Sequence, residues 1–151
     1  MVHTELWQLK DAAVEDLLGQ SGSDPTIQLS FMKSKNGQRH QVLEKEFWKK
    51  IWLQATKDGL RSNWLLWNCR FPGGTKRASN QVAVHLFPKG EALKSITSEW
   101  WEASLPKVFP DKTSEEIGKM FAETGEVRDI PITEKWTIVM MLGEQSIVSD
   151  R

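Results

Sequence analysis

The chain has 151 residues, a length that lets one domain bury about 70% of the surface exposed on unfolding, and we predict a single domain over residues 1–151. Hydrophobic residues make up 39% and charged residues 26%, which is typical of a globular chain. No apolar run reaches the roughly 18 residues of a membrane span, and the first residues lack the apolar core of a signal peptide. One cysteine, Cys69, cannot form an internal disulfide, which favours a cytoplasmic or nuclear location.

The net charge of zero hides an uneven distribution along the chain. Residues 1–24 carry a net charge of −4, residues 25–90 carry +9, and residues 91–151 carry −5. A positive middle segment favours an anionic partner such as nucleic acid. The alternative is that the acidic ends fold over this segment and neutralise it within the molecule.

The first element is predicted to be a helix near the N-terminus. Its apolar side chains recur at helical spacing, namely Leu6, Leu9, Ala13 and Leu17. Gly19 follows as a helix stop. Residues 26–32 then alternate between apolar and polar side chains, which predicts a strand. The pair at 36–37, Asn-Gly, predicts a tight hairpin turn with a short return strand through 39–42.

The middle of the chain predicts a helix followed by two strands. Residues 43–57 place Leu43, Phe47 and Ile51 on one helical face. Strands are predicted at 64–71 and 81–87, joined by a loop at 72–80 that contains two glycines.

The last third predicts two helices and a pair of strands. A helix at 98–105 should end at Pro106, and a helix at 114–123 should begin at a cap, Thr113 or Ser114. A strand at 135–142 should pair with the segment before an acidic turn at Glu134. The fold class that follows is α+β, an antiparallel sheet built from hairpins with the helices packed on one face.

Catalytic patterns are weak in this sequence. His3, His40 and His85 each stand without a second ligand at metal-binding spacing, and no phosphate-binding or nucleophile motif occurs. We therefore predict no enzyme activity, no catalytic residue, no metal and no cofactor. Cys69 lies in an apolar strand, which favours a structural thiol over a nucleophile.

Binding patterns are stronger, because three elements of the middle segment carry cations and two of these also carry tryptophans. Cations near aromatic rings are typical of proteins that bind RNA or another single-stranded nucleic acid. The predicted nucleic-acid-binding residues are Lys33, Lys35, Arg39, Lys45, Lys49, Trp52, Trp64, Trp67, Arg70, Lys76 and Arg77. Strand alternation places Trp64 and Trp67 on opposite faces of the sheet, so one of them should point away from the helices.

The rival hypothesis is a protein-interaction module, an adaptor or inhibitor. Trp100 and Trp101 are adjacent on a predicted helix, and the sequence argument holds that they cannot both point into one core. An exposed tryptophan there would anchor a protein partner, since tryptophan is enriched at interface hot spots.

Overall fold

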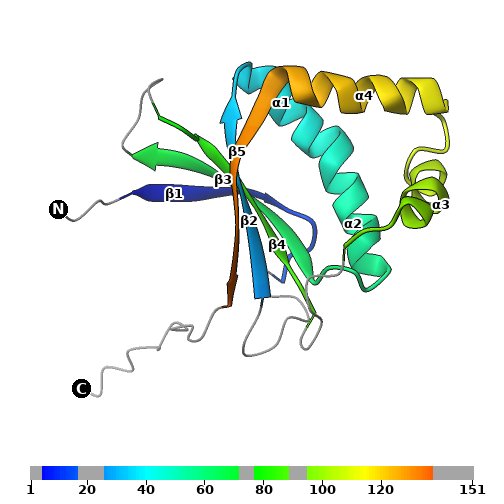
Figure 1. Cartoon of the computed structure of the whole chain (residues 1–151), viewed down its shortest axis with the longest axis horizontal. Coiled ribbons are helices and arrows are strands. Elements are labelled where there is room, and N and C mark those ends of the chain that lie inside the picture. The colour runs from blue at the N-terminus through cyan, green and yellow to red at the C-terminus, as the bar shows by residue number, and fades with distance from the viewer. Residues whose placement is uncertain (1–4, 17–25, 72–76, 89–94, 138–151) are drawn as a thin grey trace, which may run out of the picture.

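The computed structural model of the chain describes residues 5–16, 26–71, 77–88 and 95–137. In chain order the elements are β1 (Leu6–Ala12), β2 (Thr26–Ser34), α1 (Gly37–Leu43), the π-helical segment η1 (Glu44–Trp48), α2 (Lys49–Lys57), β3 (Asn63–Phe71), β4 (Gln81–Leu86), α3 (Ser98–Val108), α4 (Ser114–Val127) and β5 (Arg128–Thr137). The described strands form one five-stranded antiparallel sheet in the order β1-β3-β4-β2-β5. The helices lie on one side of it (Figure 1), which confirms the predicted α+β class.

The helical layer is held together by an apolar cluster that draws on α1, η1, α2 and α4. Phe47 and Ile51 are fully buried and meet Ile117 and Val127 of α4. The helix predicted at 43–57 is therefore confirmed. Helix α4 begins with a complete capping box, in which Thr113 and Glu116 satisfy each other's backbone N–H groups.

The two faces of the sheet carry different side chains. On the side of the helices, Trp64 of β3 lies opposite His85 of β4 and packs near Trp52 of α2. On the other side, which we call the open face, Trp67 lies opposite Val82 within an apolar cluster. The predicted division of the two β3 tryptophans between the faces is confirmed.

The predicted N-terminal helix is wrong, because residues 6–12 form strand β1. The helical spacing of its leucines is overridden by pairing with β3, in which Trp7 lies opposite Cys69 and Leu9 opposite Trp67. As a strand, β1 places both side chains on the open face, where Trp7 packs against Phe31 with ring centroids 6.4 Å apart. Burial of these rings outweighs a weak helix propensity.

The predicted hairpin at 36–37 is also wrong. Asn36 is the N-cap of α1, and its side-chain oxygen accepts a hydrogen bond from the backbone N–H of Arg39 at 3.1 Å. Asparagine suits an N-cap as well as a turn, so the pair Asn-Gly fits both structures. The return strand at 39–42 is helical instead, and β2 pairs with β4 and β5.

Two predictions for the last third are corrected as well. Helix α3 continues through Pro106 to Val108, because the proline lies in an exposed turn close to the helix end. Glu134 is not a turn but lies inside β5, opposite Leu29 of β2. The continuous ladder between β5 and β2 replaces the predicted strand pair, and the rest of the predicted strand, 138–142, lies outside the described residues.

Candidate functional site

Half of the eight predicted phosphate-binding cations are paired with acids. The pairs are Lys35 with Asp129, Arg39 with Glu123, Lys49 with Asp11, and Arg77 with Glu5. The acids come from both negatively charged ends of the chain. The alternative reading of the charge distribution, neutralisation of the middle segment within the molecule, is therefore confirmed for these four cations.

One further predicted cation, Lys33, already has a hydrogen-bond partner. The ammonium of Lys33 donates to the backbone carbonyl of Arg77 at 2.5 Å. Lys76 lies outside the described residues, as does most of the loop at 72–80. Of the predicted cations, Lys45 and Arg70 remain without a salt bridge to an acid in the described part of the chain.

Lys45 lines a groove between the first helical segment and the β1–β3 edge of the sheet. Lys10, Gln41 and Asn68 line it too, and its volume is about 180 Å³. Arg70 lies two residues beyond Asn68 on the same face of β3, where its Nε donates to the amide oxygen of Gln8 at 2.6 Å. We call the lining residues Lys10, Lys45, Gln41 and Asn68, together with the neighbouring Arg70, the basic groove.

The basic groove carries a net positive charge. Asp11 also lines it, but Lys49 Nζ lies 2.5 Å from its carboxylate and balances that charge. Within the described residues no salt bridge joins Lys10, Lys45 or Arg70 to an acid. Three uncompensated cations beside amide side chains are suited to an anion such as a phosphate group.

The predicted stacking tryptophans do not lie in the basic groove. Trp52 and Trp64 converge instead on a cavity of about 240 Å³ between the sheet and the helices. Trp48 and Trp101 line it as well, and we call it the tryptophan cavity. Because Trp64 is fully buried, it cannot stack on a base at the protein surface.

A buried ionic network closes one side of the tryptophan cavity. Glu44 and His40 are almost completely buried, and His40 Nε2 lies 2.9 Å from Glu44 Oε1. The same oxygen accepts a hydrogen bond from Arg128, whose guanidinium carbon lies 5.0 Å from the ring centroid of Trp48. Burial lowers the pKa of Arg128, and the charge of Glu44 opposes that change.

His85 also lines the tryptophan cavity and is neutral. Burial, followed by the charges of Arg61 and Arg128, lowers the pKa of His85 to about 3. Its ring meets the ring of Trp52 edge-on, with centroids 4.4 Å apart. At neutral pH the imidazole is therefore uncharged and able to act as a hydrogen-bond donor and acceptor.

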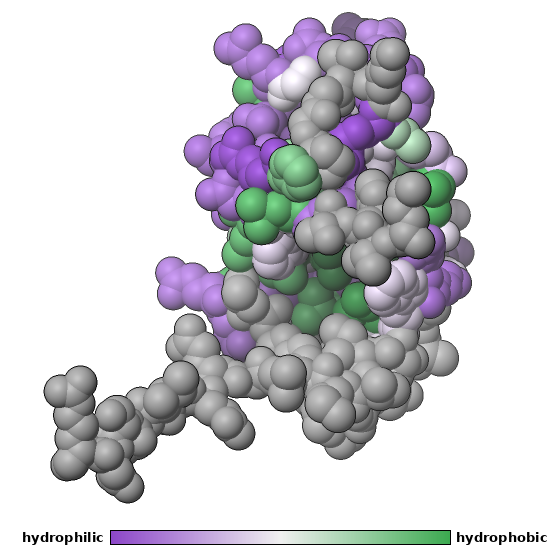
Figure 2. Space-filling view, turned by 90° about the vertical axis from the view of Figure 1, so that its left-hand side faces the viewer, coloured by the Kyte–Doolittle hydropathy of each residue, from purple (hydrophilic) through white to green (hydrophobic). Residues whose placement is uncertain are grey.

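The open face of the sheet carries an apolar cluster separate from that of the helical layer. Figure 2 shows apolar side chains gathered in the middle of this side of the molecule. The apolar cluster on this face draws on four strands; its members include Leu9, Phe31 and Trp67, which are partly buried, and Leu65, Val82 and Val84, which are buried. At its β5 edge, Ile132 and Trp136 remain 46% and 56% exposed, whereas the middle of the cluster is buried.

The predicted anchor pair of α3 is not an exposed surface. Trp100 and Trp101 both pack against the helical cluster, with ring centroids 5.3 Å apart. The premise that both could not reach one core is wrong, because Trp100 lies along the rim of the cluster and donates its indole N–H to Asp58 at 2.8 Å. Trp101 instead reaches the rings of Trp52 and Phe121.

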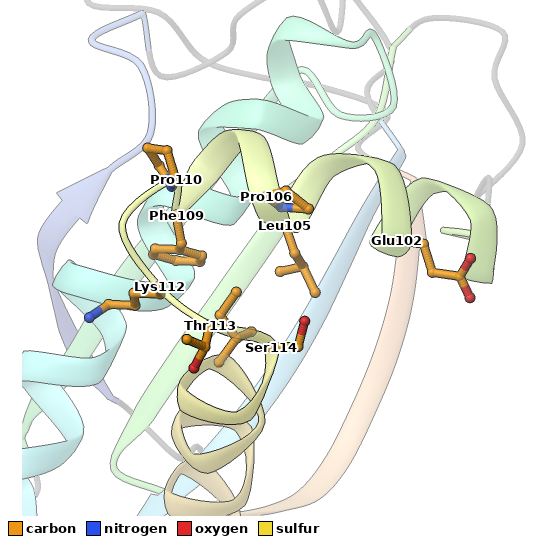
Figure 3. Close-up of a pocket in the computed structure, with 9 residues that line it drawn as sticks. Glu102, Leu105, Pro106, Phe109, Pro110, Lys112, Thr113 and Ser114 are labelled. Atoms are coloured by element: carbon orange, nitrogen blue, oxygen red, sulfur yellow. The ribbon is translucent and has the colours of Figure 1, made fainter.

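A larger cavity, of about 460 Å³, lies between the end of α3 and the start of α4. Figure 3 shows Leu105, Pro106 and Phe109 along one wall, with Thr113 and Ser114 at the start of α4 on the other. The Thr113 side chain already completes the capping box. None of the residues lining this cavity has a buried polar atom without a partner. It therefore offers little hydrogen-bonding specificity for a ligand.

Sequence reasoning missed Lys10 and the network around Glu44. Lys10 was missed because its segment was predicted to be a helix. The alternation of Trp7 and Leu9 with Gln8 and Lys10 could have indicated a strand with Lys10 on its polar side. No sequence signal joins Glu44 to Arg128, because their contact depends on the pairing of β5 with β2.

Comparisons with family models, with curated proteins and with solved structures found no match for this chain. In the described residues, no helix has both the length and the apolar character needed to cross a membrane.

Proposed function

We propose that the protein is a non-enzymatic RNA-binding protein that holds the phosphate backbone in the basic groove. The observation that supports this most is the meeting of Lys10, Lys45 and Arg70 along one edge of the sheet without acid partners in the described residues. Gln41 and Asn68 add amide groups that donate to phosphate oxygens. The proposal includes a cytoplasmic or nuclear location, which the single cysteine favours.

In this proposal the backbone is bound and the base sequence is not read. The open-face ring of Trp67 lies on the other face of β3, so stacking on it would require the strand to pass around the β1 edge. Binding led by phosphates is independent of sequence and sensitive to salt.

The test is a titration of fluorescently labelled single-stranded RNA, followed by anisotropy at several salt concentrations. The variant Lys10→Ala/Lys45→Ala/Arg70→Ala should weaken binding to every RNA sequence. Its plot of log affinity against log salt should be shallower by about 2, because each lost phosphate contact on a single strand accounts for about 0.7.

A matched control removes three cations elsewhere. Lys57→Ala/Lys107→Ala/Lys112→Ala loses the same charge from the ends of α2 and α3 and from the turn before α4. It should retain most of the affinity. The proposal is wrong if the unmodified protein does not bind RNA at low salt, or if both triple variants lose affinity equally.

A second candidate function is protein binding, and the open face supports it better than Trp100 and Trp101 do. Ile132 and Trp136 are about half exposed on this face, next to an apolar cluster whose outer rings are partly buried, and exposed apolar patches often mark interaction sites. A photo-crosslinking residue at position 132 should then capture one recurrent protein at high salt. The Trp136→Lys variant should lose that crosslink. The captured protein, once purified, should bind the purified, unmodified chain.

A further inference from the structure

The tryptophan cavity has walls suited to a flat ring. Trp48 and Trp52 stack with centroids 5.8 Å apart and planes 18° from parallel. Trp101 meets Trp52 edge-on, with centroids 6.2 Å apart. Trp64 of β3 lines the cavity from the side of the sheet. Aromatic walls favour a planar aromatic guest, since rings attract one another in both stacked and edge-on arrangements.

Three residues that line this cavity have a buried polar atom without a hydrogen-bond partner. These atoms are Glu44 Oε2, Trp64 Nε1 and His85 Nδ1. Buried polar atoms are nearly always paired, because an unpaired one loses its bonds to water without replacement. The three residues that carry these atoms line the same cavity, and this favours a ligand that supplies the missing partners.

The charges around the cavity favour a neutral ligand. Arg128 and Glu44 already neutralise each other, and His85 is uncharged because burial lowers its pKa to about 3. A cation would be repelled by Arg128, and an anion by Glu44. The orphan carboxylate oxygen requires a donor on the ligand, and the Trp64 indole N–H requires an acceptor.

We infer that the tryptophan cavity binds a small, neutral, bicyclic nitrogen heteroaromatic that donates to Glu44 and accepts from Trp64. At about 240 Å³ the cavity is smaller than typical drug-sized pockets of roughly 300–1,000 Å³, so its ligand has the size of two fused rings. The π-helical segment that carries Glu44 and Trp48 agrees with a binding role, because such segments are frequent at functional sites. The inference goes beyond RNA binding and uses none of the residues of the basic groove.

A β-bulge in β5 places two nearby isoleucines on opposite faces of the sheet. One of them tests the cavity and the other tests the open face. Phe31 pairs with Ile132, and Lys33 pairs with Asp129, so Met32 alone faces both Ile130 and Pro131. The extra residue turns Ile130 toward the cavity, which it lines, whereas Ile132 remains opposite Phe31 on the open face. The two isoleucines have nearly equal exposure, 47% and 46%.

The first test is a titration with benzimidazole, which carries one N–H donor and one ring-nitrogen acceptor. Nuclear magnetic resonance should show a saturable shift of the assigned Trp64 indole N–H signal. Under the same conditions 1-methylbenzimidazole, which lacks the donor, should bind at least about tenfold more weakly because Glu44 stays unpaired. Indene, which has neither group, should bind more weakly still.

The second test uses variants that fill or block the cavity. Ser30→Leu fills it from β2, and Ile130→Trp covers its edge. Each should lower benzimidazole affinity by about tenfold or more, while Ile132→Trp should change it by less than about twofold. Circular dichroism verifies the fold of each variant, and the ligand series on the unmodified protein remains decisive if one variant does not fold.

The inference is overturned if the Trp64 signal does not respond up to the solubility limit of benzimidazole. That result is expected if water alone fills the cavity. Equal affinity for benzimidazole and its 1-methyl derivative would also overturn it, as would an equal loss in the Ile130→Trp and Ile132→Trp variants. Loss of RNA binding in the basic-groove variant affects none of these outcomes, so the two proposals fail separately.

Discussion

Compared across strand β3, the two faces of the sheet differ in how they combine polar and apolar groups. On the helix side Trp64 is fully buried beside His85, and polar atoms of both residues have no partner. On the open face Trp67 is half-buried in a cluster made only of apolar side chains. The helix side thus has hydrogen-bonding groups, whose direction can select a ligand. The open face offers only apolar area, and the hydrophobic effect has no direction.

The two faces therefore lower the stability of the folded protein in different ways. Unpaired atoms on the helix side destabilise the folded chain, and a ligand that pairs them would recover that loss. The open face costs stability only through the apolar area left in water, which a covering partner would remove. Substitutions confined to one face therefore separate the two effects.

The largest expected effect comes from removing the two β3 tryptophans separately. Trp64→Ala should lower the free energy of unfolding by about 3–5 kcal/mol, the usual loss for a fully buried aromatic ring. Trp67→Ala should cost less, about 1–2 kcal/mol, because its ring is already partly in water. Urea denaturation followed by circular dichroism measures both values. Equal losses would contradict the contrast between the faces.

The second effect is a pH dependence that belongs to the helix side. His85 has a pKa of about 3 in the folded chain, against an ordinary value of 6.5, so below pH 6.5 the unfolded chain binds a proton that the folded chain does not. Stability should therefore fall as the pH drops from 6.5 toward 4.5, by up to about 1.4 kcal/mol per pH unit. Below that window the carboxylates Glu99, Glu116 and Glu123, whose pKa values are lowered in the folded chain, add their own losses.

The His85→Gln variant isolates this contribution. Glutamine does not titrate, so the slope of stability against pH between 6.5 and 4.5 should be smaller than in the unmodified protein. Arg61 and Arg128 are the charges that oppose protonation of His85, and the variant leaves both in place. An unchanged slope would show that the imidazole is accessible to protons in the folded chain.

The comparison of faces was partly predictable from the sequence. Period-two alternation in residues 64–71 placed Trp64 and Trp67 on opposite sides, because that pattern depends only on strand geometry. Which side the helices would cover, and that Trp64 would meet His85, depends on the register of β3 with β4 and on packing across the sheet. A single sequence contains no signal for that register.

The residues of the predicted nucleic-acid site lie in two separate places for a related reason. The sequence placed Lys45, Trp52 and Arg70 in one surface because they are close along the chain, but the fold divides them between the basic groove and the tryptophan cavity. The acids that neutralise Arg39 and Arg77, Glu123 and Glu5, lie far from them in sequence. Charge counted by segment therefore overestimated the positive surface, because long-range ion pairs do not appear in such a count.

The smallest expected effect on stability tests the open face. Ile132→Lys/Trp136→Lys should change the free energy of unfolding by less than about 0.5 kcal/mol, because both side chains are about half exposed on an edge strand and lysine is well tolerated there. The same variant should bind less of a fluorescent apolar dye, since two of the apolar groups bordering the open face are replaced by charges. Benzimidazole affinity should stay the same, because neither residue lines the tryptophan cavity. A loss of stability of several kcal/mol would mean that Ile132 and Trp136 are themselves part of the core of the protein.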